Sequence, residues 1–404
     1  MSIANTFKHT SIGLIPNDWE VKKLGKITKT TAGGTPSTQK TEYWGGNIKW
    51  MSSGDLNLKK IFDVEGRISE IGLKNSSTKI IPPKCILIGL AGQGKTRGTV
   101  AINLIELCTN QSVAAIFPSK EFHEEYLYYN LDFRYNELRQ LSTGDGGRGG
   151  LNLNIINSIS VPLPSLPEQQ KIAEILSTFD EAINTTRQII KELKVRNKGL
   201  ANQLLTGRTR VKGFEKSKWN EVKANKIFKS HTDKTHNGKL EILSATQERG
   251  VIPRSMNNID IKYDASSLGT YKKVEIGDYV ISLRSFQGGI EYSEYEGIVS
   301  PAYTILKEIV PISKLFYKVY FKTETFINRL NTIIYGIRDG KQIGFGDFST
   351  LNLPYPSIEE QKAIANILNA AKRELMQYEE KLNHLQLQKK GLMQQLLTGK
   401  TRTV

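Results

Sequence analysis

Residues Gly89 to Thr96, "GLAGQGKT", match the pattern G-x-x-x-x-G-K-[ST] of phosphate-binding loops. In such a loop, backbone amides surround phosphate oxygens, the lysine adds positive charge and the threonine reaches Mg²⁺. A nucleotide loop leads into a helix whose N-terminus faces the phosphates. Here the next residues are "RGTVAINLI", whose glycine and β-branched side chains predict a strand. We therefore favour a glycine-rich hairpin tip, with Gln93, Lys95 and Arg97 facing a different phosphate-bearing ligand, over a nucleotide site.

The charge balance indicates the class of that ligand. The 404-residue chain has 56 Lys and Arg against 40 Asp and Glu, a formal net charge of +16. This excess predicts a polyanionic partner, with a solvated basic surface as the plainer alternative. No apolar run approaches the ~18 residues of a membrane span, so nucleic acid is favoured over a membrane.

The cysteines and histidines predict no disulfide scaffold and no metal site. Cys85 and Cys108 lie in apolar, strand-like runs, which is typical of buried thiols in a reducing cytoplasm. The five histidines lack the spacing of metal ligands. We expect a cytoplasmic protein without a metal of its own.

An internal repeat organises the chain. The segment "PSLPEQQKIAEIL" (164–176) recurs as "PSIEEQKAIANIL" (356–368), and "KGLANQLLTGRTR" (198–210) recurs as "KGLMQQLLTGKTR" (390–402). Both pairs are offset by 192 residues, so no insertion separates them. Such regularity identifies two copies of one structural unit.

Each copy predicts one long helix. Ser165 and Glu168 form a capping-box pattern that recurs at 357–360, and Gly207 and Gly399 provide the stops. A helix of ~40 residues is roughly 60 Å long. Apolar residues at a seven-residue spacing predict a coiled-coil seam, with a single amphipathic helix on a globular core as the alternative.

The seam residues are Ile172, Phe179, Ile183, Ile190, Leu193, Leu200 and Leu204 in the first copy and Ile364, Leu368, Leu375, Tyr378, Leu382, Leu385, Leu392 and Leu396 in the second. Asn197 and Lys389 interrupt the seam at matching heptads. They either set the register of the helix pair or lie near a splayed end.

The predicted fold class is α+β, with a pseudo-twofold repeat. Two variable mixed α/β domains, 1–160 and 213–352, are joined by two long antiparallel coiled-coil helices in the spacer segments 161–212 and 353–404. The variable domains combine short β-branched runs with glycine turns, and their sequences differ. Two differing domains on one pair of helices would suit a DNA target made of two differing halves, or half-sites, separated by a gap.

Several segments resemble one family over essentially the whole chain. They are "IPNDWEVKKLGKI", "GGTPST" and "YWGGNIKW" near the start, "WNEVKANKIF" and "GDYVISLRSFQGGIEYS" in the second half, and "LPSLPEQQKIAEILSTFDEAI" with "QLLTGRTR" in the helices. Together they resemble the specificity (S) subunit of type I restriction–modification systems.

The resemblance implies a non-catalytic subunit whose two target-recognition domains read a bipartite, asymmetric site in double-stranded DNA. It implies that the spacer helices dock methyltransferase (M) subunits and that restriction/translocase (R) subunits join them. S-adenosylmethionine would bind the M subunit, and ATP with Mg²⁺ the R subunit, so no cofactor is expected in this chain. The phosphate-binding pattern at residues 89–96, called the Walker-like segment below, departs from that division, because the resemblance assigns ATP to the R subunit.

The residues themselves also favour a non-catalytic role. Amino-methyltransferases hold a flipped base with [DNS]-P-P-[YFW], whereas the Pro-Pro pair here lies in "IPPK" (81–84). Two alternatives remain open, namely a P-loop NTPase coupled to DNA and a coiled-coil adaptor without sequence preference.

The candidate DNA-binding residues are polar or basic side chains in glycine- or turn-flanked stretches. They are Gln93, Lys95, Arg97 and Arg148 in the first domain and Arg249, Arg254, Arg284, Gln287, Arg338 and Lys341 in the second. A good bidentate base contact discriminates by about 1–3 kcal/mol. We expect about half of the second-domain candidates to touch only phosphate or solvent.

Overall fold

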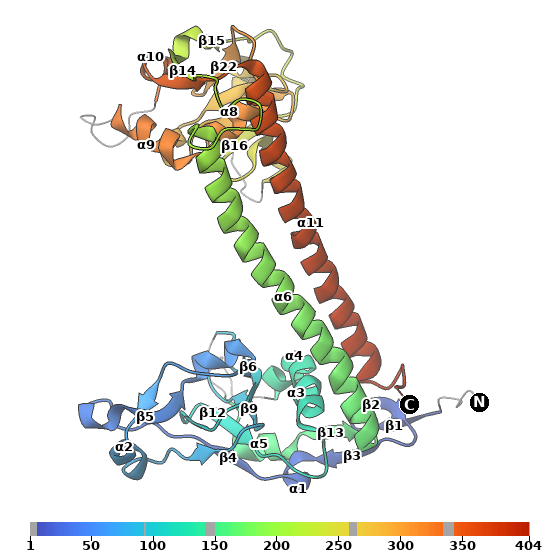
Figure 1. Cartoon of the computed structure of the whole chain (residues 1–404). Coiled ribbons are helices and arrows are strands. Elements are labelled where there is room, and N and C mark those ends of the chain that lie inside the picture. Colours follow the sequence, from blue (N-terminus) through green and yellow to red (C-terminus); the bar gives the residue numbers. More distant parts are fainter. Residues whose placement is uncertain (1–5, 93, 142–149, 258–264, 334–342, 404) are drawn as a thin grey trace. The chain divides into compact units, whose positions relative to one another are not determined.

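A computed structural model describes residues 6–92, 94–141, 150–257, 265–333 and 343–403 (Figure 1). The chain divides into two compact units, Met1–Arg187 with Lys381–Val404, and Gln188–Glu380. Each unit contains part of both long helices together with one variable domain. The helical segments are therefore integral to the two units and do not form a unit of their own.

The first unit begins with many short strands and ends in a long helix. Its elements are β1 (Phe7–Thr10), β2 (Gly13–Pro16), β3 (Glu20–Lys23), α1 (Leu24–Ile27), β4 (Thr30–Ala32), η1 (Thr41–Tyr43), β5 (Trp44–Met51), η2 (Ser53–Leu58), β6 (Lys60–Ile61), β7 (Arg67–Ile68), α2 (Glu70–Lys74), β8 (Ile80–Ile81), β9 (Ile86–Gly89), β10 (Val100–Asn103), β11 (Leu107–Thr109), β12 (Val113–Ile116), α3 (Glu124–Phe133), α4 (Tyr135–Gln140), α5 (Leu153–Ser158), β13 (Ser160–Leu163) and α6 (Leu166–Leu205).

The two larger sheets of this unit contribute to two hydrophobic cores. One has the order β4-β12-β9-β10-β6 and the other β7-β5-β11-β8. Because successive side chains of a strand point to opposite faces, Ile86 and Ile88 of β9 join the core formed with α3 and α6, and Leu87 joins a second core with Met51. Burial on both faces accounts for the unbroken apolar run of β9.

The two cysteines are free and buried, as the sequence predicts. Burial raises the pKa of the Cys85 thiol to about 12 and that of Cys108 to about 11. Because the thiolate is the reactive form, both side chains act as small apolar core residues.

The second unit also combines short strands with helices, but its sheets are smaller. Its elements are β14 (Asn220–Lys223), η4 (Ala224–Lys226), β15 (Phe228–His231), β16 (Leu243–Thr246), β17 (Gly250–Pro253), η5 (Arg254–Met256), η6 (Ala265–Thr270), β18 (Lys272–Val274), β19 (Tyr279–Ile281), α7 (Ser285–Gly288), β20 (Glu291–Tyr292), β21 (Gly297–Val299), β22 (Thr304–Glu308), α8 (Lys314–Tyr320), α9 (Glu324–Thr332), α10 (Phe345–Ser349), β23 (Asn352–Tyr355) and α11 (Ile358–Leu396).

Four strands of one sheet in each unit correspond in order. The antiparallel order β4-β12-β9-β10 of the first is matched by β15-β22-β19-β20 in the second. In each unit the strand before a long helix pairs with a strand near the start of the domain, β13 with β3 and β23 with β14. The loop after β9 thus corresponds to the loop after β19.

Aromatic rings fill the core of the second unit. The Phe228 ring lies 5.3 Å from that of Tyr317, 5.4 Å from Tyr279 and 5.7 Å from Phe321, measured between centroids. Edge-on and tilted contacts of this kind stabilise a core beyond the area they bury. They fix the turn after α8, on which one of the candidate loops rests.

The ends of the long helices follow the repeat. The backbone N–H of Glu168 donates to the Ser165 hydroxyl at 3.4 Å, and that of Glu360 to Ser357 at 3.3 Å. Helix α6 stops before Gly207, which has a φ of +69°, and α11 stops before Gly399, at +68°. The left-handed backbone favours glycine at both stops.

The expected capping boxes are only half right. The serines do cap the helices, but the glutamate side chains turn to distant arginines. The Arg402 guanidinium donates to the Glu168 carboxylate at 2.6 and 2.8 Å, and that of Arg210 donates to Glu360 at 2.8 Å through two nitrogens. An ion pair with a fixed arginine competes better for a buried carboxylate than a single backbone amide does.

Within each unit the two long helices pack antiparallel. In the second unit Lys194 pairs with Glu379 at 2.9 Å and Arg196 with Glu374 at 2.6 Å. A later residue of α6 thus pairs with an earlier residue of α11, as in an antiparallel pair. In the first unit Asp180 pairs with Lys389. All fifteen predicted seam residues are buried or half-buried. The prediction of two long antiparallel helices is confirmed.

Both polar residues of the seam contact the other helix. The Asn197 side-chain amide donates to the Ala371 carbonyl at 2.9 Å. The Lys389 ammonium lies 2.5 Å from the Asp180 carboxylate, to which the Tyr129 hydroxyl also donates, at 2.6 Å. These contacts support the register interpretation over a splayed end.

Candidate nucleic-acid interface

The Walker-like segment is a β-hairpin. Strands β9 and β10 pair antiparallel, with Ile88 opposite Val100, and the loop between them spans residues 90–99. Gly92 and Gly98 have φ of +125° and +77°, conformations that suit glycine. A second strand follows the loop, so the chain does not continue from it into a helix as it does after a nucleotide-binding loop. The prediction of a hairpin at this segment is confirmed.

Helix α4 holds this hairpin from the side. The Tyr135 hydroxyl donates to the Lys95 carbonyl at 3.0 Å, and the Arg139 guanidinium donates to the Gly94 carbonyl at 2.7 Å. The Thr99 hydroxyl donates to the same Lys95 carbonyl at 2.7 Å. These bonds fix the backbone at Lys95 while its side chain stays exposed. A fixed backbone lowers the entropic cost of binding through that side chain.

The other candidates near this hairpin are placed in part. Arg97 is half-buried in the hairpin loop. Gln93 and Arg148 lie outside the described residues, as do Arg338 and Lys341 in the second domain.

In the second unit the described candidates gather on two neighbouring loops. The α7 loop (residues 282–290) carries Arg284 and Gln287, both exposed. The β16–β17 hairpin (243–253) carries exposed Arg249 at its tip. The Gln247 side chain of the hairpin donates to the Gln287 side-chain oxygen at 3.4 Å, so the two loops are in contact.

Arg254 joins this group from η5. Burial raises the pKa of the Tyr303 phenol, while the charges of Arg254 and Arg284 act to lower it. The Arg249 guanidinium donates to the Met256 carbonyl of η5 at 3.0 Å. Hydrogen bonds thus connect the hairpin that carries Arg249 both to the α7 loop, through Gln287, and to η5, on which Arg254 is half-buried.

Sequence reasoning missed the lysine beneath these loops. The Lys322 ammonium donates to the Gly288 carbonyl at 2.8 Å, to the Gln247 carbonyl at 3.1 Å and to the Glu291 carboxylate at 2.5 Å. Burial raises the pKa of Glu291, whose side chain is 1% exposed, to about 7, while Lys322 acts to lower it. No motif surrounds Lys322, so no sequence signal indicated this role.

The repeated arginine–glutamate pairs were also missed, although a signal was present. Arg210 and Arg402 are 192 residues apart, as are Glu168 and Glu360. Each arginine also lies over a tryptophan, Arg402 at 5.9 Å from the Trp19 ring and Arg210 at 5.4 Å from Trp219. Identity at all four positions could have suggested an interaction between the start of one helix and the end of the other.

Comparison with known families accounts for the repeat. A family model described as "Type I restriction modification DNA specificity domain" matches residues 16–195 and again residues 215–386. The chain belongs to this family. It carries two copies of the specificity domain, and each copy includes one variable domain and part of the long helix that follows it.

Relatives of this specificity-domain protein include subunits of type I restriction enzymes. It is 38% identical to the MjaIX specificity subunit of Methanocaldococcus jannaschii over 186 residues, 45% of this chain and 42% of that protein. That match thus spans less than half of the relative's length. It is 27% identical to the MjaVIII specificity subunit of the same organism over 96% of this chain and 94% of the relative.

The fold is shared with a solved structure. The S subunit of a type I restriction–modification system from M. genitalium aligns with a TM-score of 0.58 at 15% identity, covering 98% of each chain. At this identity the likeness shows the fold alone.

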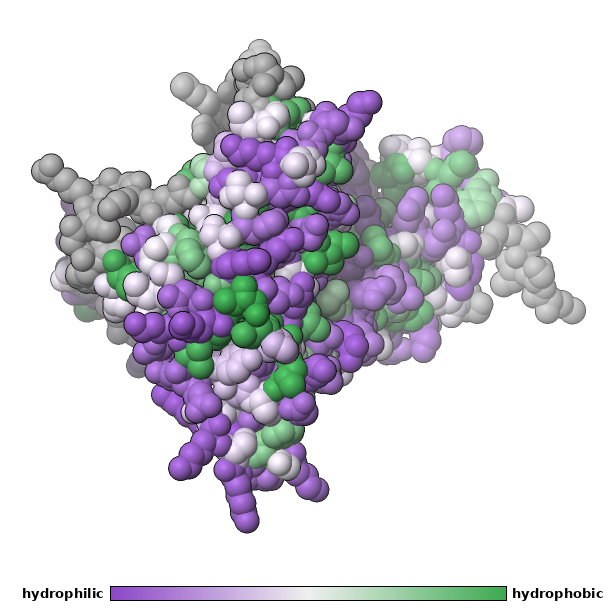
Figure 2. All heavy atoms as spheres, turned by 90° about the horizontal axis from the view of Figure 1, so that it is seen from above, coloured by the Kyte–Doolittle hydropathy of each residue, from purple (hydrophilic) through white to green (hydrophobic). Residues whose placement is uncertain are grey.

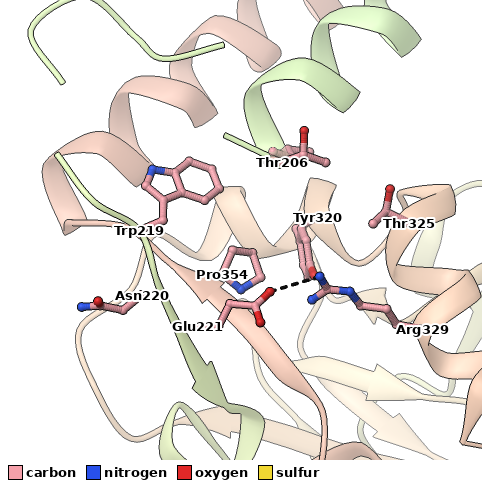
Figure 3. A pocket seen from close by; sticks show the side chains of 9 residues that line it. Thr206, Trp219, Asn220, Glu221, Tyr320, Thr325, Arg329 and Pro354 are labelled. Atoms are coloured by element: carbon pink, nitrogen blue, oxygen red, sulfur yellow. Dashed lines mark hydrogen bonds and ion pairs between the residues drawn. The ribbon is translucent and has the colours of Figure 1, made fainter. Parts of the chain in front are cut away.

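The second specificity domain contains a pocket of about 180 Å³ (Figure 3). Its lining comprises Leu205, Thr206, Trp219, Asn220, Glu221, Tyr320, Thr325, Arg329 and Pro354. Arg329 turns toward Glu221, with 3.1 Å between the guanidinium and the carboxylate, and it also donates to the Asn352 carbonyl. Because this guanidinium is already bonded within the chain, the pocket is a poor anion site.

The surface of the specificity-domain protein is mostly polar on the face in Figure 2, with apolar side chains scattered among hydrophilic ones. Among the described residues, no helix is both long and apolar enough to cross a membrane. In the same part of the chain, no group of three His, Cys, Asp or Glu side chains could hold a metal ion.

Proposed function

We propose that this chain is the DNA sequence-recognition subunit of a type I restriction–modification enzyme. Its first recognition domain (1–160) and second recognition domain (213–352) each read one half of a bipartite, asymmetric site. The observation that carries this proposal is that the family match occurs twice while corresponding loops differ, "LAGQGKTRGT" after β9 and "SLRSFQGGI" after β19. Equivalent positions with different side chains suit different bases.

The charge of the chain supports DNA as the ligand. A net charge of +16 favours contact with phosphates, which supplies affinity without sequence information. Lys95, Arg249 and Arg284 add exposed basic groups on loops held by the fold. We expect some of them to contact bases and others to contact only phosphate.

We further infer that the helices α6 and α11 dock M subunits and set the unread gap between the half-sites. R subunits complete the enzyme. Methylation with S-adenosylmethionine belongs to the M subunits and ATP-driven restriction with Mg²⁺ to the R subunits, while this chain directs both without catalysing either. The antiparallel ion pairs along the helices support their role as a scaffold of fixed register.

The test is to map the methylated motif in cells that express this chain with its M subunit. We expect a two-part motif with a fixed gap. Arg284→Ala should relax one base of one half and leave the other half unchanged, whereas Lys400→Ala, at an exposed site outside the candidate loops, should leave the motif intact. A contiguous motif, or equal affinity for random and selected duplexes, would contradict the proposal.

A further inference from the structure

Lys322 lies where three segments of the second recognition domain meet. An ammonium group has three N–H donors, and Lys322 directs them to the α7 loop through Gly288, to the β16–β17 hairpin through Gln247, and to strand β20 through Glu291. The two carbonyls belong to segments 41 positions apart in the sequence. The hydrogen bond between the Gln247 and Gln287 side chains, which also links the loops, is 3.4 Å long and so near the limit of a hydrogen bond.

We propose that Lys322 is a positioning residue for sequence readout, which holds the α7 loop and the β16–β17 hairpin in one fixed arrangement over a single half-site. This inference rests on the proposed function. Arg284 and Gln287 project from one of the two loops and Arg249 from the other. Bidentate recognition of a base requires donors at defined positions, so the relative placement of the loops determines which base is accepted.

The base of the Lys322 side chain is itself fixed. Lys322 lies in the turn between α8 and α9, and its backbone N–H donates to the Val319 carbonyl at 3.0 Å. The preceding Phe321 is fully buried in the aromatic core. A Cβ at Gly289, whose φ is +80°, would lie only 1.9 Å from the Phe321 carbonyl oxygen. The α7 loop therefore rests directly on the turn that carries Lys322.

Glu291 provides the counter-charge beneath the loops. Its side chain is 1% exposed on β20, beside β19 in the sheet. The ion pair thus links Lys322 to the sheet as well as to the loops. Because a buried charge needs a partner, the two residues stabilise each other's position.

The first recognition domain contains a corresponding contact. The loop after β9 corresponds to the loop after β19, and the Arg139 guanidinium of α4 donates to the Gly94 carbonyl there at 2.7 Å. In both domains, then, a cation from the helical part binds a carbonyl of the glycine loop. The recurrence on different local sequences indicates that holding this loop is a requirement of the domain.

The test compares three variants in the complex with the M subunit. Lys322→Met keeps the apolar stem and removes the donors. Lys322→Arg keeps the charge, but a planar guanidinium cannot reproduce the three ammonium directions. Lys318→Met is the matched control, because Lys318 lies on α8 and pairs with the exposed Glu294. Melting temperature reports folding, and binding to duplexes with single-base changes reports discrimination in each half-site.

We expect Lys322→Met to reduce discrimination about tenfold, the equivalent of one base contact, in the half-site that Arg284→Ala also relaxes. Discrimination in the other half-site should stay unchanged, and Lys322→Arg should fold and show a smaller loss. If Lys322→Met does not fold, Lys322→Arg decides. A folded variant with wild-type discrimination, equal loss in both halves, or uniform weakening for all sequences would overturn the inference. A wild-type chain without a bipartite motif would instead refute the proposed function.

Discussion

Replacement of Arg402 by Met should destabilise the first unit strongly. The Arg402 guanidinium donates twice to Glu168 and twice to Asp18, the latter at 2.7 and 3.0 Å. Glu168 is 1% exposed and would keep one donor among its described partners, the Trp19 indole N–H at 3.2 Å. Loss of one partner from a buried ion pair costs about 3–5 kcal/mol. The exposed Asp18 pair adds at most ~1 kcal/mol.

Urea unfolding measures this cost. We expect Arg402→Met to lower the free energy of unfolding by about 3–5 kcal/mol, and Lys400→Met, an exposed site in the same segment, to change it by less than ~0.5 kcal/mol. Because the chain has two units, the loss should be confined to one transition. The equivalent variant Arg210→Met, which removes the arginine partner of the buried Glu360, should shift the unfolding transition of the second unit.

A double variant separates this mechanism from a general loss of packing. Glu168→Gln with Arg402→Met leaves no unpaired buried charge, so it should be more stable than Arg402→Met alone. The reasoning would be refuted if Arg402→Met unfolded within ~1 kcal/mol of the wild type, or if the double variant recovered nothing.

Three further outcomes are expected. The folded-state pKa of Glu291, about 7, lies above its ordinary value of 4.5. Protonation of Glu291 therefore stabilises the folded state, and this stabilisation is lost as the pH rises from about 4.5 to about 7. Unfolding from pH 5 to pH 8 should show Glu291→Gln gaining stability relative to the wild type, and a constant difference would contradict the pKa shift. Gly289→Ala should lower the free energy of unfolding by more than ~2 kcal/mol, and with it the melting temperature, because the added Cβ would meet the Phe321 carbonyl. An unchanged melting temperature would disprove the close approach. One added heptad in each helix, within 187–193 and 379–385, adds ~10 Å and should lengthen the methylated gap by about three base pairs, whereas an unchanged gap would show that the helices do not set it.

The sequence by itself determined the features that depend on local patterns. Helix periodicity and end signals involve residues only a few positions apart, so α6 and α11 could be predicted close to their ends. The strand after Thr96 distinguished a hairpin from a nucleotide loop for the same reason. The repeat predicted the antiparallel pair, because two like helices with like exits can pack about a twofold axis.

Only the tertiary structure decided which distant side chains meet. Glu168 appeared in the sequence as half of a capping box, but folding brings Arg402, 234 positions away, to its carboxylate. Lys322 belongs to no motif and gains its role from two carbonyls and a carboxylate supplied by other segments. Such contacts depend on how sheets, loops and helices pack, and a buried charge takes the partner that packing provides, whatever its distance along the chain.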